Sequence, residues 1–204
     1  VGYPIISLGA ECQRQGLQFY GMRNEQSASY AAAAVGYLTG VPGVCIVVSG
    51  PGLVHAVAGM ANAKENCWPM LCLGGSSEQR QKGMGGFQEA MQLEYARPAC
   101  KYVAYAESAA RIPFYIESAC RWAMGGRPGA TYVDLPGDVL REFVEGEVFY
   151  PERCLPPALT NADPAAVSEA MQVLAAAQRP LLVVGKGAAF AEAQDELLAL
   201  VEAT

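Results

Sequence analysis

Short apolar runs and longer alanine-rich stretches alternate along the chain. The short runs are rich in β-branched and other apolar side chains, which is typical of buried strands, and they lie at residues 18–22, 44–49, 70–74, 130–135 and 181–184. The longer stretches have helical spacing and predict helices at residues 5–15, 27–38, 53–65, 87–95, 112–124, 164–177 and 188–202. Residues 101–104 are a candidate for one more short strand. This alternation predicts an α/β fold with a mostly parallel sheet and helices on both faces.

A change in pattern after residue 144 indicates a domain boundary. Residues 144–163 have no sustained period and contain several prolines, which is typical of a linker. Asp163 followed by Pro164 is typical of a helix start. We therefore predict three parts: a domain at residues 1–145, a linker at 146–162, and the incomplete start of a second, Rossmann-like α/β domain at 163–204.

Composition and charge argue against a disordered, a membrane-spanning and a nucleic-acid-binding protein. Hydrophobic residues make up 52% of the chain and charged residues 17%, which argues against general disorder. The longest apolar runs fall far short of the ~20 residues needed to cross a bilayer, so no membrane span is expected. The net charge is -6, and lysine and arginine never cluster, so we expect no nucleic-acid partner.

The cysteines indicate the redox compartment of the protein, and the termini indicate that the chain is a segment of a longer one. The 7 cysteines are scattered and never form a C-x-x-C pair, and the chain has 1 histidine, which indicates reduced thiols in an intracellular compartment rather than a zinc site. The chain starts at Val1 without a methionine or a signal-peptide pattern, and it stops within or just after a predicted helix. We therefore expect an internal segment of a longer protein, with the first domain truncated at its start.

Three glycine-containing segments follow predicted strands, where ligands bind on parallel sheets. They lie at residues 49–52, 74–77 and 185–187. The third is similar to the opening of a dinucleotide-binding fingerprint, but Phe190 stands where that pattern needs its third glycine. We interpret it as a tight turn and predict no nucleotide site there.

Glu25 is the most informative charged residue. It lies in the segment Arg23-Asn24-Glu25-Gln26, between a predicted strand and an alanine-rich helix. A carboxylate at this edge of a sheet can serve catalysis, and the small residues behind it let another backbone or subunit approach closely. It can equally be a structural charge at a helix start, worth ~0.3 to 1 kcal/mol through the helix dipole. Position alone leaves both interpretations open.

Five separated motifs together resemble the pyrimidine-binding domain of thiamine-diphosphate enzymes. They are Val1-Gly2-x-Pro4, Arg23-Asn24-Glu25-Gln26, Val48-Ser49-Gly50-Pro51-Gly52, Phe87-Gln88-Glu89, and Gly126-Arg127-Pro128-Gly129 with Val133-Asp134-Leu135-Pro136. Acetolactate synthase, oxalyl-CoA decarboxylase and 2-hydroxyacyl-CoA lyase share this succession. The segments around His55, Trp68 and residues 74–78, and residues 179–189, are most similar to the 2-hydroxyacyl-CoA lyase family.

The resemblance implies a cofactor site. In this family a buried glutamate, here Glu25, protonates N1′ of the aminopyrimidine, and the resulting imino nitrogen takes the proton from C2 of the thiazolium. Pro51 and Gly52 would let backbone approach the aminopyrimidine ring, and Pro4 would belong to the same cofactor site. Gln88 would reach the reacting carbonyl or the thiazolium.

For some of these residues a purely structural role remains an alternative to the catalytic one. Gln88 could be an exposed polar residue near a helix start. His55 could orient a substrate oxygen as a third catalytic residue, or it could be a hydrogen-bonded structural histidine. We interpret Glu89 as a helix-start charge and Asp134 as structural.

The resemblance also implies an activity. The whole protein would be a carbon-carbon lyase that cleaves an acyl-CoA thioester, 2-hydroxyacyl-CoA, to formyl-CoA and a shortened aldehyde, as in fatty acid alpha-oxidation. It would be peroxisomal in a eukaryote, or otherwise cytoplasmic. The alternatives are an enzyme of the acetolactate synthase or oxalyl-CoA decarboxylase type, or a non-catalytic fragment or regulatory module.

The resemblance also implies that the Mg²⁺ ligands and a second subunit are supplied from outside this sequence. The family binds Mg²⁺ through a Gly-Asp-Gly segment and a later Asn, whereas Gly137-Asp138 lacks the second glycine. We therefore expect no metal ligand among these residues and expect the Mg²⁺ site elsewhere in the protein. Because the family's cofactor lies between two subunits, we expect a homodimer or homotetramer.

Overall fold

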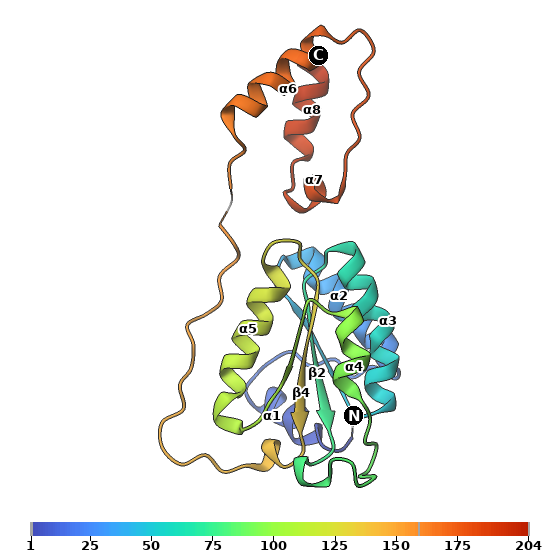
Figure 1. Ribbon diagram of the computed structural model, residues 1–204, viewed down its shortest axis with the longest axis vertical. Coiled ribbons are helices and arrows are strands. Elements are labelled where there is room, and N and C mark those ends of the chain that lie inside the picture. Colours follow the sequence, from blue (N-terminus) through green and yellow to red (C-terminus); the bar gives the residue numbers. More distant parts are fainter. Residues whose placement is uncertain (1, 159, 204) are drawn as a thin grey trace. The chain divides into compact units, whose positions relative to one another are not determined.

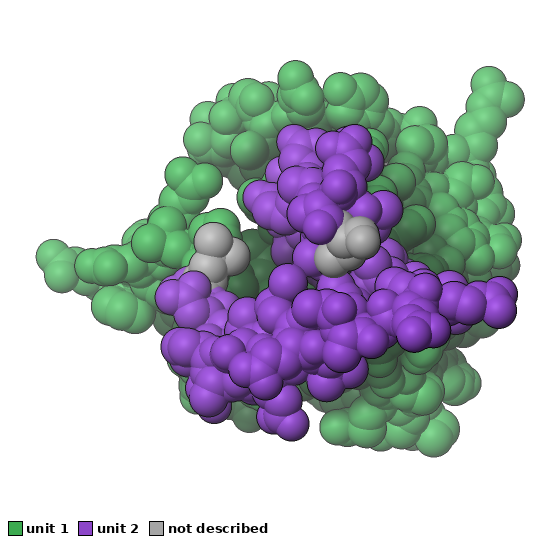
Figure 2. Space-filling model, turned by 90° about the horizontal axis from the view of Figure 1, so that it is seen from above, with its two compact units in different colours: residues 1–157 green, residues 158–204 purple. Residues whose placement is uncertain are grey.

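The structure is a computed structural model that describes residues 2–158 and 160–203. It divides into two compact units, Val1–Pro157 and Ala158–Thr204, which Figure 2 distinguishes by colour. Val1, the first residue of one family motif, lies outside the described residues. The division falls inside the segment predicted to be a linker, and the bounds of that linker stay a prediction.

A parallel sheet forms the centre of the first unit (Figure 1). Within the described residues its strands are β1 (Gly43–Val47), β2 (Met70–Ser76), β3 (Tyr102–Tyr105) and β4 (Ala130–Pro136), in the order β1-β2-β4-β3. Every neighbouring pair is parallel. β2 and β4 are buried along their whole length, which explains their continuous apolar sequences. The predicted α/β fold with a parallel sheet is confirmed, and the candidate strand at 101–104 corresponds to β3.

Helices cover both faces of the sheet (Figure 1). One face carries α2 (Glu25–Thr39), α3 (Pro51–Asn66) and α4 (Gln92–Ala96), and the other carries α1 (Ile6–Arg14) and α5 (Ile112–Met124). Alternate strand residues point to opposite layers, so Cys72 packs toward α3 whereas Leu71 packs toward α5. Short 3₁₀ helices lie at Gln79–Gln81, Arg97–Ala99, Ala109–Arg111 and Val139–Arg141.

Small residues allow α2 to lie very close to its neighbours. A Cβ added at Gly36 would lie 1.7 Å from the carbonyl oxygen of Pro69, and one added at Gly59 would lie 2.1 Å from Ser29 Oγ. Neither position accepts a larger residue unless the helix moves or Ser29 moves away. The alanine-rich composition of α2 therefore serves close packing against α3 and the start of β2.

The ends of α2 place Glu25 in its first turn. The Asn24 side chain accepts hydrogen bonds from the backbone N–H groups of Gln26 and Ser27, so the helix begins at Glu25 rather than at residue 27 as predicted. Gly40 ends the helix with φ of 67°, in the left-handed region that favours glycine.

The strand predicted at residues 18–22 is wrong. These residues form an irregular segment that pairs with no strand, and Tyr20 is 75% exposed. Aromatic side chains favour strands only where a neighbouring strand and a buried face exist, and this segment has neither.

The helix predicted at residues 87–95 is also wrong in its first half. α4 begins only at Gln92. Gln88 has φ of 54°, and Gly83 and Gly85 before it also have positive φ, so the chain cannot be helical through this stretch. Residues 83–91 form a loop at the C-terminal ends of the strands.

The second unit is helical in its described residues. It contains α6 (Pro164–Ala176), α7 (Lys186–Phe190) and α8 (Gln194–Ala203), and Asp163 caps α6 by accepting a hydrogen bond from the N–H of Ala165. The helix predicted at 188–202 is thus divided into α7 and α8, and the strand predicted at 181–184 is wrong. Residues 181–184 are exposed and form no strand. A strand needs a neighbouring strand to pair with, and residues 160–203 contain none. The strand of the expected Rossmann-like start is therefore absent from this described stretch.

Across residues 2–158 and 160–203, no helix combines the length and the apolar character that a bilayer crossing requires.

Candidate active site

Glu25 and His55 lie side by side although they are far apart in the sequence. Glu25 begins α2, His55 lies near the start of α3, and His55 Nδ1 is 3.2 Å from Glu25 Oε2. Partial burial opposes ionisation of Glu25, but a hydrogen bond from its own backbone N–H and the contact with His55 outweigh it. The pKa of Glu25 therefore lies below its usual value, and the site presents a carboxylate at neutral pH.

The turn between β1 and α3 lies next to this pair. Gly50 has φ of 60° and ψ of -111°, which suits glycine, and Pro51 begins α3. A Cβ added at Gly52 would lie 2.6 Å from Val48 Cγ2 and 3.8 Å from Glu25 Oε1. The backbone at Gly52 therefore lies directly beside the Glu25 carboxylate.

Gln88 approaches the same turn from the loop before α4. Ser49 Oγ donates a hydrogen bond of 3.4 Å to Gln88 Oε1, and a Cβ added at Gly50 would lie 2.9 Å from the carbonyl oxygen of Gln88. The structure thus brings Glu25, His55, Pro51, Gly52 and Gln88 together beyond the C-terminal end of β1, where ligands bind on open parallel sheets. Their chemical roles stay predictions.

Pro4 lies at the ends of β2 and β4 instead. A Cβ added at Gly75 would lie 2.5 Å from Pro4 Cδ, and one added at Gly137 would lie 3.2 Å from Pro4 Cβ. Pro4 is buried, so these contacts fix the first residues of the chain against the sheet. Its role in cofactor binding stays a prediction.

Glu89 organises the glycine-rich loop that precedes it. Its carboxylate accepts hydrogen bonds from the backbone N–H groups of Gly83, Gly85 and Gly86. These bonds, the one from Gly83 foremost, lower the pKa of Glu89. The interpretation of Glu89 as a helix-start charge is wrong, because α4 begins three residues later and the carboxylate turns back into the loop.

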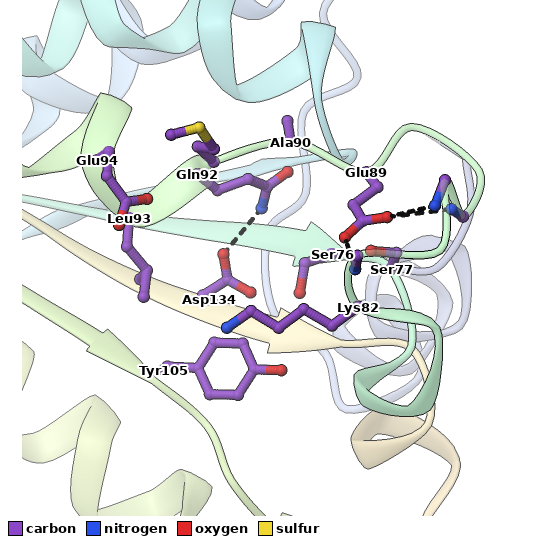
Figure 3. Close-up of a pocket in the computed structure, with 14 residues that line it drawn as sticks. Ser76, Ser77, Lys82, Glu89, Ala90, Gln92, Leu93, Glu94, Tyr105 and Asp134 are labelled. Atoms are coloured by element: carbon purple, nitrogen blue, oxygen red, sulfur yellow. Dashed lines mark hydrogen bonds between the residues drawn. The ribbon is translucent and has the colours of Figure 1, made fainter.

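A pocket of about 490 Å³ opens behind this loop, at the C-terminal ends of β2, β3 and β4. Figure 3 shows the Lys82 side chain lying between Tyr105 and Asp134, with Lys82 Nζ 5.4 Å from the centre of the Tyr105 ring. Ser76 Oγ and Asp134 Oδ1 are buried and have no hydrogen-bond partner among the residues that the structure describes. Burial raises the pKa of Asp134.

Gln92 connects the turn at Gly50 to this pocket, and the sequence analysis missed it. Its Oε1 accepts a hydrogen bond of 2.6 Å from the N–H of Gly50. Its Nε2 donates to the carbonyl oxygen of Gly75 at 3.0 Å and to Asp134 Oδ2 at 2.9 Å. Only 3% of Gln92 is exposed. An amide side chain in the first turn of a short helix ordinarily faces solvent, so the sequence carried no signal of this role.

The sequence is similar to those of known proteins along nearly its whole length. Residues 1–95 match the family model for the N-terminal TPP binding domain of thiamine pyrophosphate enzymes. The 2-hydroxyacyl-CoA lyase 1 of Homo sapiens is 50% identical over 203 residues, which is 99% of this chain. The chain is therefore similar to thiamine pyrophosphate enzymes over residues 1–95, and to a 2-hydroxyacyl-CoA lyase over nearly all of its length.

Two further proteins are similar to nearly the whole chain. The 2-hydroxyacyl-CoA lyase of Arabidopsis thaliana is 42% identical over 214 residues, covering 100% of the chain and 37% of that protein. The oxalyl-CoA decarboxylase of Escherichia coli (strain K12) is 35% identical over 212 residues, covering 99% of the chain and 37% of that protein. The human protein is covered over 35% of its length, so the chain spans about a third of these relatives. The resemblance to 2-hydroxyacyl-CoA lyases and oxalyl-CoA decarboxylase is confirmed.

The part of the chain that matches the family model contains most of the candidate site. Glu25, His55 and Gln88 lie within residues 1–95, and Asp134 lies beyond them. Within the described ranges, no three His, Cys, Asp or Glu side chains gather in a group that could hold a metal ion.

Replacing Asp134 by asparagine is expected to stabilise the protein at neutral pH. The asparagine carbonyl can still accept hydrogen bonds from Gln92 and Tyr132, and no buried charge remains. Because the folded-state pKa of Asp134 is raised, the parent protein loses stability as the pH rises from the unfolded-state pKa through the folded-state one. We expect the variant to be about 1 kcal/mol more stable at neutral pH, an advantage that shrinks as the pH falls toward ~4.

Urea denaturation of both proteins at a series of pH values measures this difference. A variant that is less stable by the same amount at every pH would contradict the buried-charge explanation.

Proposed function

We propose that the chain is part of a thiamine-diphosphate-dependent lyase that cleaves 2-hydroxyacyl-CoA. The observation that carries this proposal is the 50% identity to the 2-hydroxyacyl-CoA lyases 1 of Homo sapiens and Mus musculus over 203 residues. The reaction breaks the bond between the thioester carbon and the hydroxylated carbon. The hydroxylated carbon leaves in an aldehyde one carbon shorter, and the thioester carbon takes up a proton to give formyl-CoA.

The residues beyond β1 fit the aminopyrimidine ring of thiamine diphosphate. Glu25 offers a partly buried carboxylate, and Gly52, which is buried and has no side chain, lies next to that carboxylate. Pro51 lines the same turn, and Pro4 is included on the strength of the family pattern. When bound, the cofactor supplies a nucleophilic carbon at C2 of its thiazolium ring.

We assign Glu25 the role of holding and moving the proton at N1′ of that ring. His55 favours the ionised carboxylate, which is the form that can accept or share this proton. The contact therefore supports a role for His55 in orienting Glu25, in addition to the predicted contact with a substrate oxygen. The position of Gln88 against the same turn supports the proposal that its amide reaches the reacting carbonyl.

The remaining parts of the proposal concern the whole protein. We propose that Mg²⁺ and the diphosphate bind to residues outside this chain, and that the site is completed by a second subunit in a homodimer or homotetramer. We also propose a peroxisomal location in a eukaryote. The family pattern supports these three statements.

A second candidate is decarboxylation of oxalyl-CoA. The 35% identity to the oxalyl-CoA decarboxylase of Escherichia coli (strain K12) over 212 residues favours it over other reactions. Both candidates use a CoA thioester and release formyl-CoA, so the second product distinguishes them.

Product analysis of the full-length protein tests the proposal. We expect a 2-hydroxyacyl-CoA to give formyl-CoA and the shortened aldehyde in equal amounts, because one bond is cleaved per turnover. Mass spectrometry and an aldehyde assay measure both products, and pyruvate and oxalyl-CoA serve as comparison substrates. Carbon dioxide from oxalyl-CoA without aldehyde from the hydroxyacyl substrate would favour the decarboxylase, and acetolactate from pyruvate would contradict both candidates.

A further inference from the structure

We propose that Gln92 is a positioning residue that holds the turn at residues 49–51 in the shape the active site needs. The proposal concerns the chain's own backbone, and only its effect on turnover rests on the proposed function. It begins from the contacts of one buried amide, which joins the end of β1, the end of β2 and the end of β4.

The orientation of the Gln92 amide is fixed by its surroundings. Oε1 faces the N–H of Gly50, whereas Nε2 faces three acceptors: the carbonyl oxygen of Gly75, the carboxylate of Asp134 and the hydroxyl oxygen of Tyr132. A reversed amide would place two donors together and two acceptors together. Asp134 is itself held by the hydroxyl of Tyr132, which donates to Asp134 Oδ2 at 2.9 Å. Gln92 therefore has one stable arrangement.

This arrangement bears directly on the candidate site. The N–H of Gly50 is the group that Gln92 binds, and Gly50 has a sparsely populated backbone conformation, φ 60° and ψ -111°, which this hydrogen bond helps to hold. The neighbours of Gly50 are the residues that the site uses: Pro51 and Gly52 follow it, and the carbonyl of Gln88 lies against it. A change of the turn would therefore move Gln88 and the backbone beside Glu25 together.

The first test of this role needs neither substrate nor cofactor. In the full-length protein, Gln92→Leu removes the acceptor for the N–H of Gly50, and we expect this amide to exchange with deuterated water about tenfold faster or more. Hydrogen exchange of a peptide covering residues 49–52, followed by mass spectrometry, measures it. Thr131→Val is the matched control, because it removes a buried hydroxyl of β4 that donates to the carbonyl oxygen of Met70 and does not contact Gln92.

The second test is turnover. We expect Gln92→Leu to lower kcat by about ten- to a hundredfold, because a small misplacement of reacting groups has effects of this size. We expect Thr131→Val to lose stability but to keep kcat within about threefold, because the hydrogen bond that it removes lies outside the Gln92 network. Equal losses of kcat in the two variants, or unchanged exchange at Gly50 in Gln92→Leu, would overturn the proposal.

A third variant keeps the proposal testable if Gln92→Leu does not fold. Gln92→Glu retains an oxygen for the N–H of Gly50 but places a carboxylate against Asp134, so we expect it to lower kcat. Adding Asp134→Asn supplies an amide donor to the new carboxylate, and we expect the double variant to recover most of the loss. Lack of any recovery would overturn the proposed network. If the parent protein cleaves no 2-hydroxyacyl-CoA while exchange at Gly50 responds as expected, the proposed function fails and the positioning of the turn by Gln92 stands.

Discussion

Glu25→Gln in the full-length protein is expected to lower turnover by about 10²- to 10⁴-fold, equivalent to roughly 3 to 5 kcal/mol of barrier. Glutamine retains the size of glutamate and a hydrogen bond, but it can neither accept nor return a proton at N1′. The rate at which the C2 proton of bound thiamine diphosphate exchanges into deuterated water should fall in parallel. Steady-state turnover and NMR of the C2 proton measure the two effects.

Folding of this variant should be nearly unchanged, because a helix-start carboxylate contributes at most ~1 kcal/mol. Glu11→Gln is the matched control. Glu11 also has a lowered pKa, of about 2, which Arg14 causes, but it lies on the exposed side of α1. We expect this control to turn over like the parent protein. Turnover and proton exchange of Glu25→Gln within a few-fold of the parent would show that Glu25 is only a helix-start charge.

The largest effect on stability is expected for Gly36→Ala. Helix propensity alone would make alanine better than glycine within α2 by about 1 kcal/mol. The new Cβ, however, would lie 1.7 Å from the carbonyl oxygen of Pro69, a backbone atom that cannot rotate away. Because α2 would have to move off the start of β2, we expect a net loss of about 3 kcal/mol or more, or an insoluble protein. Chemical denaturation measures the loss.

Gly9→Ala makes the same substitution where there is room. Gly9 lies within α1, and a Cβ added there would meet only the Phe19 ring, at 3.4 Å. We expect this variant to be as stable as the parent or slightly more stable. If both alanine variants have the same stability, the close approach of α2 to Pro69 is not required for folding.

The strand wrongly predicted at residues 181–184 shows what an apolar sequence pattern cannot predict. Residues 70–74 and 181–184 are both short apolar runs, yet the first lies at the centre of a parallel sheet and the second forms no strand. An apolar run indicates that a segment favours burial, but strand formation also needs hydrogen bonds from a neighbouring segment. For residues 70–74 the neighbours are β1 and β4, whereas the described residues of the second unit offer none.

The sequence by itself determined most of the alternation of elements in the first unit and the family motifs that single out Glu25, because these depend on side chains near one another in the chain. Only the tertiary structure decided that His55 contacts Glu25 and that Gln92 binds Gly50, pairs separated by 30 and 42 positions. It also decided that Gln88 has left-handed backbone geometry and that Glu89 closes a loop. Burial and hydrogen-bond partners arise when distant strands and helices pack together, and no local pattern encodes which polar side chains will meet there.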